Sequence, residues 1–323
     1  MNKKILILSF LSVLFLAAGP IRAAIGVTNL RTEQLKNPSG IDTHQPRLGW
    51  RIESNEQNVM QTAYHILVAS TPELLEQGKG DIWDSGKIES DASQWIAYQG
   101  KTLKRNAPYY WKVKIDTNKG TTDWSTPAFW TTGLFNEADW QGQWIGLDKA
   151  APGDSETQWS RLAARYLRKE FALKKEVKRA TVHIAGMGLY ELFINGQRIG
   201  NQVLAPAPTD YRKTILYNTY DVTSLLQTEN AIGVTLGNGR FYTMRQNYKP
   251  YKIPTFGYPK LRLNLIVEYA DGSKETIATN TTWKLTTDGP IRSNNEYDGE
   301  EYDARKELGN WTQTGYDDKS WMP

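Results

Sequence analysis

The sequence predicts an all-β protein in which a fibronectin III or immunoglobulin-like β-sandwich is followed by a jelly-roll β-sandwich. Three observations lead to this prediction. Short runs of alternating apolar and polar residues recur along the chain, separated by Gly, Pro, Asn and Asp turns. Aromatic residues are abundant, with 12 Trp, 17 Tyr and 8 Phe, and aromatics suit sandwich cores. Only residues 71–77 show a helical pattern, and that stretch is short.

The first 24 residues are predicted to be an export signal. Lys3 and Lys4 precede an uncharged apolar run at 5–18, and small residues follow, so cleavage is expected after Ala23 or Ala24. No other apolar run is long enough to span a membrane, and the sequence contains no cysteine. We therefore expect a periplasmic or secreted protein without a lipid anchor, a membrane span or disulfides.

Residues 25–136 are predicted to form the first sandwich. The spacing of the strand-like runs is typical of an immunoglobulin or fibronectin III sandwich. These runs lie at 25–33, 47–53, 63–70, 81–88, 94–98, 109–115 and 128–133. The composition then changes, and residues 137–160 are expected to be a linker.

Residues 161–308 are predicted to form the jelly roll. Asn195-Gly196 and Asp271-Gly272 each separate two strand-like runs, as hairpin turns do. Further strands are expected at 166–173, 179–188, 217–222, 230–239 and 283–287, with a short helical turn after 222. Residues 309–323 resemble the start of a further segment with Trp311 and Trp321 as core aromatics, so a longer protein is expected.

Charge and histidine placement exclude two classes of function. The formal net charge is +4, and Lys and Arg are scattered among Asp and Glu, so no basic stripe indicates a nucleic-acid partner. His44, His65 and His183 lie in separate segments without a second ligand at metal spacing, which argues against a zinc site.

Several blocks of sequence together resemble one enzyme family. They are residues 188–200, 203–223, 236–242 and 289–305, preceded by an opening that contains residues 37–42 and 46–50. In this order and at these separations they resemble the N-terminal region of bacterial α-L-rhamnosidases of the glycoside hydrolase family 78 type. The resemblance covers nearly the whole chain after the export signal.

The resemblance implies where the chemistry lies. In this family an (α/α)6 barrel follows the fibronectin-like and jelly-roll domains, and two glutamates of the barrel hydrolyse terminal α-L-rhamnosyl residues by inversion. Nothing in the sequence matches the barrel, so no catalytic residue is assigned, and whether the chain itself is an enzyme stays open. The implied role is support of the barrel of the same polypeptide on a rhamnose-containing glycan. The alternative is a stand-alone carbohydrate-binding or adhesive β-sandwich protein.

The resemblance also implies a candidate sugar site. In some members the jelly roll binds rhamnose with a calcium ion through oxygen ligands in loops. The corresponding loops here, about 200–212 and 238–256, contain Asn201, Asp210, Asn238, Tyr242 and Asn247. Gly200 stands where an acidic residue is expected beside the asparagine, which argues against calcium. In the alternative interpretation, Asp210 and Asn238 cap turns and the tyrosine packs.

An acidic cluster precedes the C-terminal segment and consists of Glu296, Asp298, Glu300, Glu301 and Asp303. A glycosidase needs two carboxyl groups on either side of one bond, whereas alternate residues of a strand point to opposite faces. We therefore expect a structural role, with Arg292 and Arg305 pairing with these carboxylates.

Overall fold

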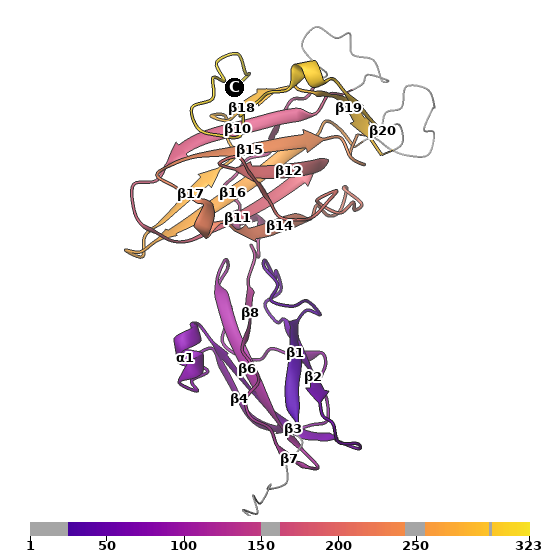
Figure 1. The fold of residues 1–323 in the computed structure, drawn as a ribbon, viewed down its shortest axis with the longest axis vertical. Coiled ribbons are helices and arrows are strands. Elements are labelled where there is room, and N and C mark those ends of the chain that lie inside the picture. The colour runs from indigo at the N-terminus through magenta and orange to yellow at the C-terminus, as the bar shows by residue number, and fades with distance from the viewer. Residues whose placement is uncertain (1–24, 150–161, 243–255, 297–298) are drawn as a thin grey trace, which may run out of the picture.

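The computed structural model describes residues 25–149, 162–242, 256–296 and 299–323. In these residues strands predominate, and two β-sandwich units lie end to end along the long axis (Figure 1). The predicted all-β class is therefore confirmed. The predicted export signal, residues 1–24, lies outside the described residues.

The first unit packs two antiparallel sheets around tryptophan. One sheet has the order β1 (Gly26–Thr32), β2 (Arg47–Glu53), β5 (Ile96–Ala97). The other has the order β4 (Trp83–Glu89), β3 (Gln61–Ala69), β6 (Pro108–Thr117), β7 (Gly120–Thr121), with β8 (Ala128–Thr131) also paired to β6. Trp50, Trp111 and Trp130 are 1%, 0% and 0% exposed between the sheets. Such buried aromatic area is the main stabilising contribution of a small sandwich core.

The predicted helical stretch is confirmed as α1 (Pro72–Glu76). Proline occupies its first turn, where no backbone donor is needed, and the Thr71 hydroxyl accepts a hydrogen bond from the Leu74 amide at 3.3 Å. After the first unit come η1 (Glu137–Asp139) and β9 (Ile145–Gly146), and β9 pairs with a strand of the second unit. Residues 145–146 of the predicted linker therefore contact the second unit.

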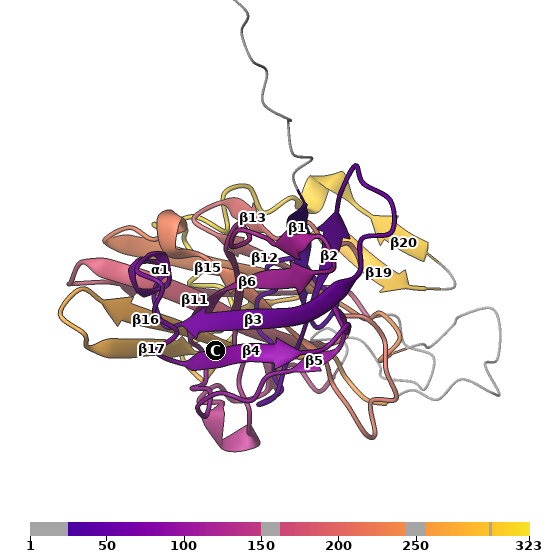
Figure 2. The same ribbon diagram turned by 90° about the horizontal axis from the view of Figure 1, so that it is seen from below.

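The second unit also packs two antiparallel sheets. One has the order β13 (Gln197–Ile199), β12 (Leu189–Ile194), β15 (Glu229–Gly237), β10 (Arg165–Ala172), β18 (Lys284–Thr286). The other has the order β14 (Tyr217–Asp221), β11 (Val177–Met187), β16 (Lys260–Tyr269), β17 (Lys274–Ala278). Aliphatic residues from both sheets, among them Val182, Ile232 and Leu263, are 0% exposed and form the core. A hairpin of β19 (Ile291–Asn295) and β20 (Gly299–Tyr302) lies at the rim of this unit (Figures 1 and 2).

Both predicted hairpin turns are confirmed. Asn195 and Gly196 have φ angles of 51° and 84° between β12 and β13, the positive values that a type I′ turn requires. Gly272, at φ 82°, lies between β16 and β17. The short helical turn expected after residue 222 is η2 (Thr223–Leu225).

The C-terminal segment packs on the second unit after η3 (Ala304–Lys306). The Arg168 guanidinium of β10 is 1% exposed, pairs with Asp318 and donates a 2.9 Å hydrogen bond to the Trp311 carbonyl. Trp321, 6% exposed, joins the small core that includes Tyr166. The division into residues 25–136, 137–160, 161–308 and 309–323 stays a prediction.

The two units are joined by specific hydrogen bonds. The Tyr217 hydroxyl of β14 accepts from the Leu134 amide at 2.9 Å and donates to the Leu134 carbonyl at 3.2 Å. Burial raises the pKa of Tyr217 to about 12, so the hydroxyl keeps its proton at neutral pH. His183 of β11 is 0% exposed and reaches Asn106 of the first unit, with 3.3 Å between Nε2 and Oδ1. The joint is therefore polar and ordered.

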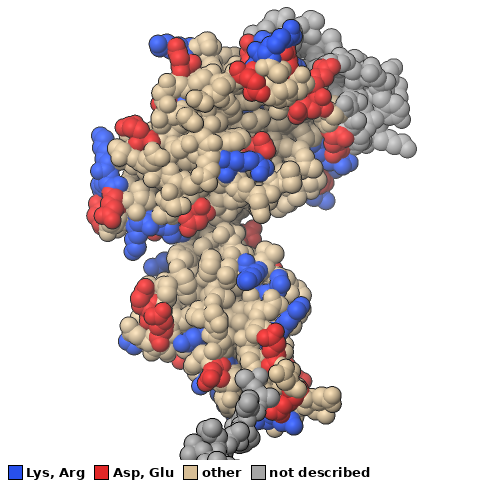
Figure 3. Space-filling view, in the orientation of Figure 1, with Lys and Arg blue, Asp and Glu red and all other residues tan. Residues whose placement is uncertain are grey.

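Charges of both signs are interspersed on the face of the molecule shown in Figure 3. This distribution agrees with the mixed charge pattern of the sequence. Within the described ranges, no helix is both long and apolar enough to cross a membrane.

Candidate functional site

The predicted sugar loops meet at one end of the second unit through an aromatic cluster. The Tyr211 ring lies 5.2 Å from Phe241 and 5.3 Å from Phe256, both centroid to centroid and in edge contact. Tyr211 is 9% exposed, and its buried hydroxyl has no hydrogen-bond partner among the described residues. Sequence reasoning missed Tyr211 and Phe241, although both lie within the blocks that carry the family resemblance.

Asp210 and Asn201 have local or solvent-facing positions in this region. The Asp210 carboxylate pairs with Arg212 at 2.9 Å, and the Asp210 carbonyl accepts from the Lys213 and Thr214 amides. The hydrogen bond from Arg212 lowers the pKa of Asp210. Asp210 thus stabilises a turn, which agrees with the alternative interpretation. Asn201 is exposed at the start of the loop.

Asn238 is 2% exposed at the end of β15 and links three segments. Its Nδ2 donates to the Leu162 carbonyl at 3.0 Å and to the Asn294 carbonyl at 2.7 Å, while its amide donates to Asn294 Oδ1 at 2.6 Å. Within the described part of the chain, its own Oδ1 accepts no hydrogen bond, and Asn294 Nδ2 donates none. An unpaired buried polar atom lowers the folding stability by about 1–3 kcal/mol. We therefore expect a ligand or a water molecule to pair with these two atoms.

Tyr242 is 7% exposed and stacks on Tyr258, with ring centroids 5.9 Å apart and planes 25° apart. It shares contacts with Leu162, to which Asn238 donates, so Tyr242 and Asn238 belong to one neighbourhood. No hydrogen bond or ion pair between described residues joins Asn201 or Asp210 to this pair. Asn247 lies outside the described residues.

The described residues do not fit a calcium site. Calcium takes six to eight oxygen ligands. In the part of the chain that the structure describes, no group of three His, Cys, Asp or Glu residues is suited to a metal ion. The Asp210 carboxylate is already paired with Arg212, whose positive charge would repel a cation.

The acidic cluster has structural contacts. Asp303 caps η3, and the hydrogen bond from Arg305 lowers its pKa to about 2, so it is a poor proton donor. Glu296 pairs with Arg240 at 3.3 Å, Glu300 and Glu301 are exposed on β20, and Asp298 lies outside the described residues. The predicted pairing of Arg305 is confirmed.

The pairing predicted for Arg292 with this cluster is wrong. The Arg292 guanidinium turns back to the Thr287 and Gly289 carbonyls at 2.9 and 2.8 Å and lies 3.6 Å from Asp288. These acceptors lie only a few residues before Arg292 in the sequence. They therefore take the hydrogen bonds of the guanidinium that the acidic cluster was expected to accept.

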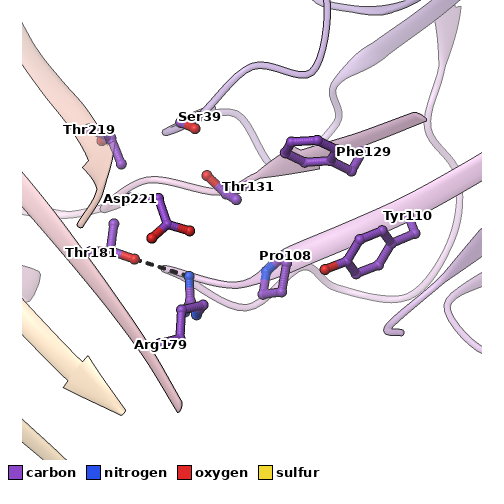
Figure 4. A pocket seen from close by; sticks show the side chains of 9 residues that line it. All are labelled: Ser39, Pro108, Tyr110, Phe129, Thr131, Arg179, Thr181, Thr219 and Asp221. Atoms are coloured by element: carbon purple, nitrogen blue, oxygen red, sulfur yellow. Dashed lines mark hydrogen bonds between the residues drawn. The ribbon is translucent and has the colours of Figure 1, made fainter. Parts of the chain in front are cut away.

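A second concave feature lies between the two units and was not predicted. It is a cavity of about 260 Å³ lined from the first unit by Tyr110 and Phe129, among others, and from the second by Arg179 and Asp221. Figure 4 shows the two aromatic rings on one side and Arg179, Thr181 and Asp221 on the other. Each of these residues belongs to a run with the usual apolar–polar alternation of a strand. Nothing in the sequence therefore predicts that they are neighbours in space.

Comparison with known proteins identifies both units. Residues 27–136 match the family model described as the Rha78A-like, N-terminal immunoglobulin domain, and residues 175–323 match the α-L-rhamnosidase N-terminal domain. An α-L-rhamnosidase of Formosa agariphila is 40% identical over 305 residues, which cover 88% of this chain and 32% of that relative. The chain thus spans about a third of the length of such relatives.

Solved structures agree with these matches. The α-L-rhamnosidase of Dictyoglumus thermophilum superposes with a TM-score of 0.82 at 40% identity, covering 92% of this chain and 33% of that one. The α-L-rhamnosidase of Streptomyces avermitilis, solved with L-rhamnose, superposes with a TM-score of 0.83 at 25% identity, covering 93% of this chain and 44% of that one.

Proposed function

The chain belongs to the α-L-rhamnosidases as their N-terminal immunoglobulin-like and jelly-roll domains, and from this we propose that it supports an enzyme that hydrolyses terminal α-L-rhamnosyl residues. In this proposal the chain is the non-catalytic portion, and its partner is a catalytic barrel of the same polypeptide. The substrate would be a rhamnose-containing glycan.

One observation carries the proposal. A Rha78A-like immunoglobulin domain and an α-L-rhamnosidase N-terminal domain match the chain one after the other, and the α-L-rhamnosidase relatives extend well beyond the matched region. The described carboxylates of the acidic cluster, which could have suggested acid–base chemistry, have an exposed position or a cation as partner, as for Asp303 and Glu296. An inverting glycosidase instead needs one proton donor with a raised pKa opposite a base.

An activity assay tests the proposal. We expect the purified chain to release no p-nitrophenol from p-nitrophenyl α-L-rhamnoside above the buffer rate. A longer polypeptide that carries this chain and a catalytic barrel should release it. Release by the purified chain alone, retained after repeated chromatography, would place catalysis in these two sandwiches and contradict the proposal.

The surface of the second unit supports a contact with the rest of such a polypeptide. Val203 and Leu204 are 81% and 72% exposed within the first predicted sugar loop. Tyr302, on the exposed strand β20, is 53% exposed. Exposed apolar groups of this kind favour a docking surface. We propose that the barrel covers this side of the second unit.

Two finer proposals concern export and sugar binding. We propose that residues 1–24 direct export to the periplasm or the medium, on the charge and apolar pattern given above. We also propose that the end of the second unit around Tyr211, Asn238 and Tyr242 contacts glycan. The unpaired buried Tyr211 hydroxyl and Asn238 Oδ1 support this, and calcium is not part of the proposal.

A further inference from the structure

The cavity between the two units has walls that are held at a fixed separation. Beside it, Tyr217 makes two hydrogen bonds to the Leu134 backbone, and the Arg179 guanidinium donates to the Asn106 carbonyl. The two units also approach each other closely at Gly40 of the first unit. A Cβ atom at this position would lie only 2.3 Å from Thr219 Oγ1 of the second unit. The cavity is therefore preformed, as most small-molecule sites are, and it lies at a domain boundary, where such sites are common.

The polar groups of the cavity retain hydrogen-bonding capacity. Asp221 Oδ1 accepts from the Thr223 amide and hydroxyl at 2.9 and 2.6 Å, whereas Oδ2 accepts nothing among the described residues. The Tyr110 hydroxyl likewise has no hydrogen-bond partner in the described chain. One carboxylate oxygen and one hydroxyl thus remain available in a single cavity (Figure 4).

Arg179 offers hydrogen-bond donors at fixed positions, and its positive charge is offset by a neighbouring carboxylate. Its Nη1 donates to Thr181 Oγ1 at 3.2 Å, and its Nη2 donates to Glu268 Oε1 at 2.7 Å. Glu268 Oε1 also accepts from Lys274 Nζ at 2.8 Å, so Arg179, Lys274, Glu268 and Asp221 together carry two positive and two negative charges. The Nε–H of Arg179 has no partner among the described residues. This balance favours a neutral ligand over an anion.

The other wall is aromatic. Phe129 is 37% exposed, and its ring centroid lies 6.2 Å from that of Tyr110. A pyranose presents a C–H face that packs on such a ring and hydroxyls at its edge that reach polar groups. A carboxylate oxygen accepts from sugar hydroxyls, and a tyrosine hydroxyl can donate or accept. A volume of about 260 Å³ suits one sugar ring rather than a chain of them.

We propose that the cavity between the immunoglobulin-like and jelly-roll units is a binding subsite for one neutral sugar unit, with Asp221 as hydroxyl acceptor and Phe129 as stacking surface. This inference rests on the proposed function for its substrate class, since the glycan of that function supplies the sugar. It assigns a binding role to the domain joint, away from the loop end of the jelly roll.

Isothermal titration calorimetry on the full chain tests the subsite with methyl α-L-rhamnoside as the neutral probe and sodium D-glucuronate as the acidic one. We expect saturable binding of the rhamnoside and at least tenfold weaker binding of glucuronate. Asp221→Asn and Phe129→Ala should each weaken rhamnoside binding by about tenfold, from a lost charge-assisted hydrogen bond and a lost ring contact. Tyr110→Phe keeps the ring and should weaken binding less.

Asp271→Asn is the matched control, because Asp271 Oδ1 accepts from the amide and hydroxyl of Ser273 at 2.9 and 2.6 Å, as Asp221 Oδ1 does from Thr223, and Asp271 does not line the cavity. It should bind the rhamnoside through the cavity as the wild-type chain does, and thermal melts should show each variant folded. Unchanged binding in both Asp221→Asn and Phe129→Ala would overturn the inference, as would no saturable binding or equal binding of glucuronate. None of these results bears on the p-nitrophenyl rhamnoside assay, so the two proposals fail separately.

Discussion

His183 shows how a single buried residue can make the joint between the units sensitive to pH. Its Nδ1 lies 2.9 Å from Thr219 Oγ1 and its Nε2 lies 3.3 Å from Asn106 Oδ1, so both ring nitrogens have neutral partners. Burial, helped by the nearby Arg179 guanidinium, lowers the pKa of His183 to about 4. The imidazole is therefore neutral in the folded chain at pH 7.

This arrangement gives a pH prediction. Between pH 6.5 and 4 the unfolded chain binds a proton at His183 that the folded chain does not, so the free energy of unfolding falls as the pH falls through this window. The full loss is on the order of 3 kcal/mol. Urea unfolding at pH 7, 6 and 5 should show this slope in the wild-type chain and a smaller one in His183→Gln.

The control is His44→Gln, which removes an exposed histidine of the first unit whose ring lies 4.0 Å from that of Phe135 and which has no ion pair among the described residues. It should keep the slope of the wild-type chain. Equal slopes in the wild-type and His183→Gln chains would show that His183 does not titrate in this window.

At the residue scale, the sequence predicted only what depends on neighbours along the chain. Asp303 and Arg305 are two positions apart, and their pairing was foreseen because little else could compete. The partners of Arg292 and the unpaired Oδ1 of Asn238 were not foreseen. Asp221 and Phe129, at the ends of strands in different units, become neighbours only after both units fold and dock.

At the scale of elements, the two hairpins were predictable because their turns are short and require positive φ angles. Asn195-Gly196 and Asp271-Gly272 show that requirement directly in the sequence. The neighbours of β10 were not predictable, because it pairs with β15 and β18, which lie far along the chain. Pairing between strands so far apart in the sequence leaves no local sequence pattern. The number of strands was therefore easier to infer than their order in the sheets.

The two hairpin glycines provide a matched pair of substitutions. Gly196 and Gly272 have φ angles of 84° and 82°, so alanine at either position should cost roughly 1–2 kcal/mol in backbone strain. A Cβ at Gly196 would also lie 2.9 Å from Gln313 Nε2 of the C-terminal segment, whereas a Cβ at Gly272 meets nothing within 4 Å.

We therefore expect Gly196→Ala, but not Gly272→Ala, to speed amide hydrogen exchange in residues 309–323. Thermal unfolding should show a similar loss of stability in both variants. Equal exchange in the two variants would show that the C-terminal segment packs independently of this turn.

At the scale of the whole molecule, polar contacts link the two units end to end, and those of Tyr217 stand beside the contacts of His183 and Arg179 with Asn106. Tyr217→Phe removes both hydrogen bonds to Leu134 and should weaken the joint while each sandwich stays folded. We expect the distribution of distances between the units to broaden.

Spin labels can measure that distribution, because the chain has no cysteine of its own. Lys79→Cys and Lys319→Cys place one label on each unit at exposed positions. Tyr220→Phe is the control, since its hydroxyl bonds to Gln202 inside the second unit at 3.0 Å. An unchanged distribution in Tyr217→Phe would show that other contacts hold the units in place.

The end-to-end arrangement also determines how the molecule would carry a mechanical load. Strand β1, near the start of the described chain, belongs to the first unit, and the C-terminal end belongs to the second unit (Figure 1). Tension between these two points must pass through the narrow junction where Tyr217 meets Leu134. Several hydrogen bonds cross that junction, including those of Tyr217 and Arg179, and we expect them to break under load before the sheets of either sandwich separate.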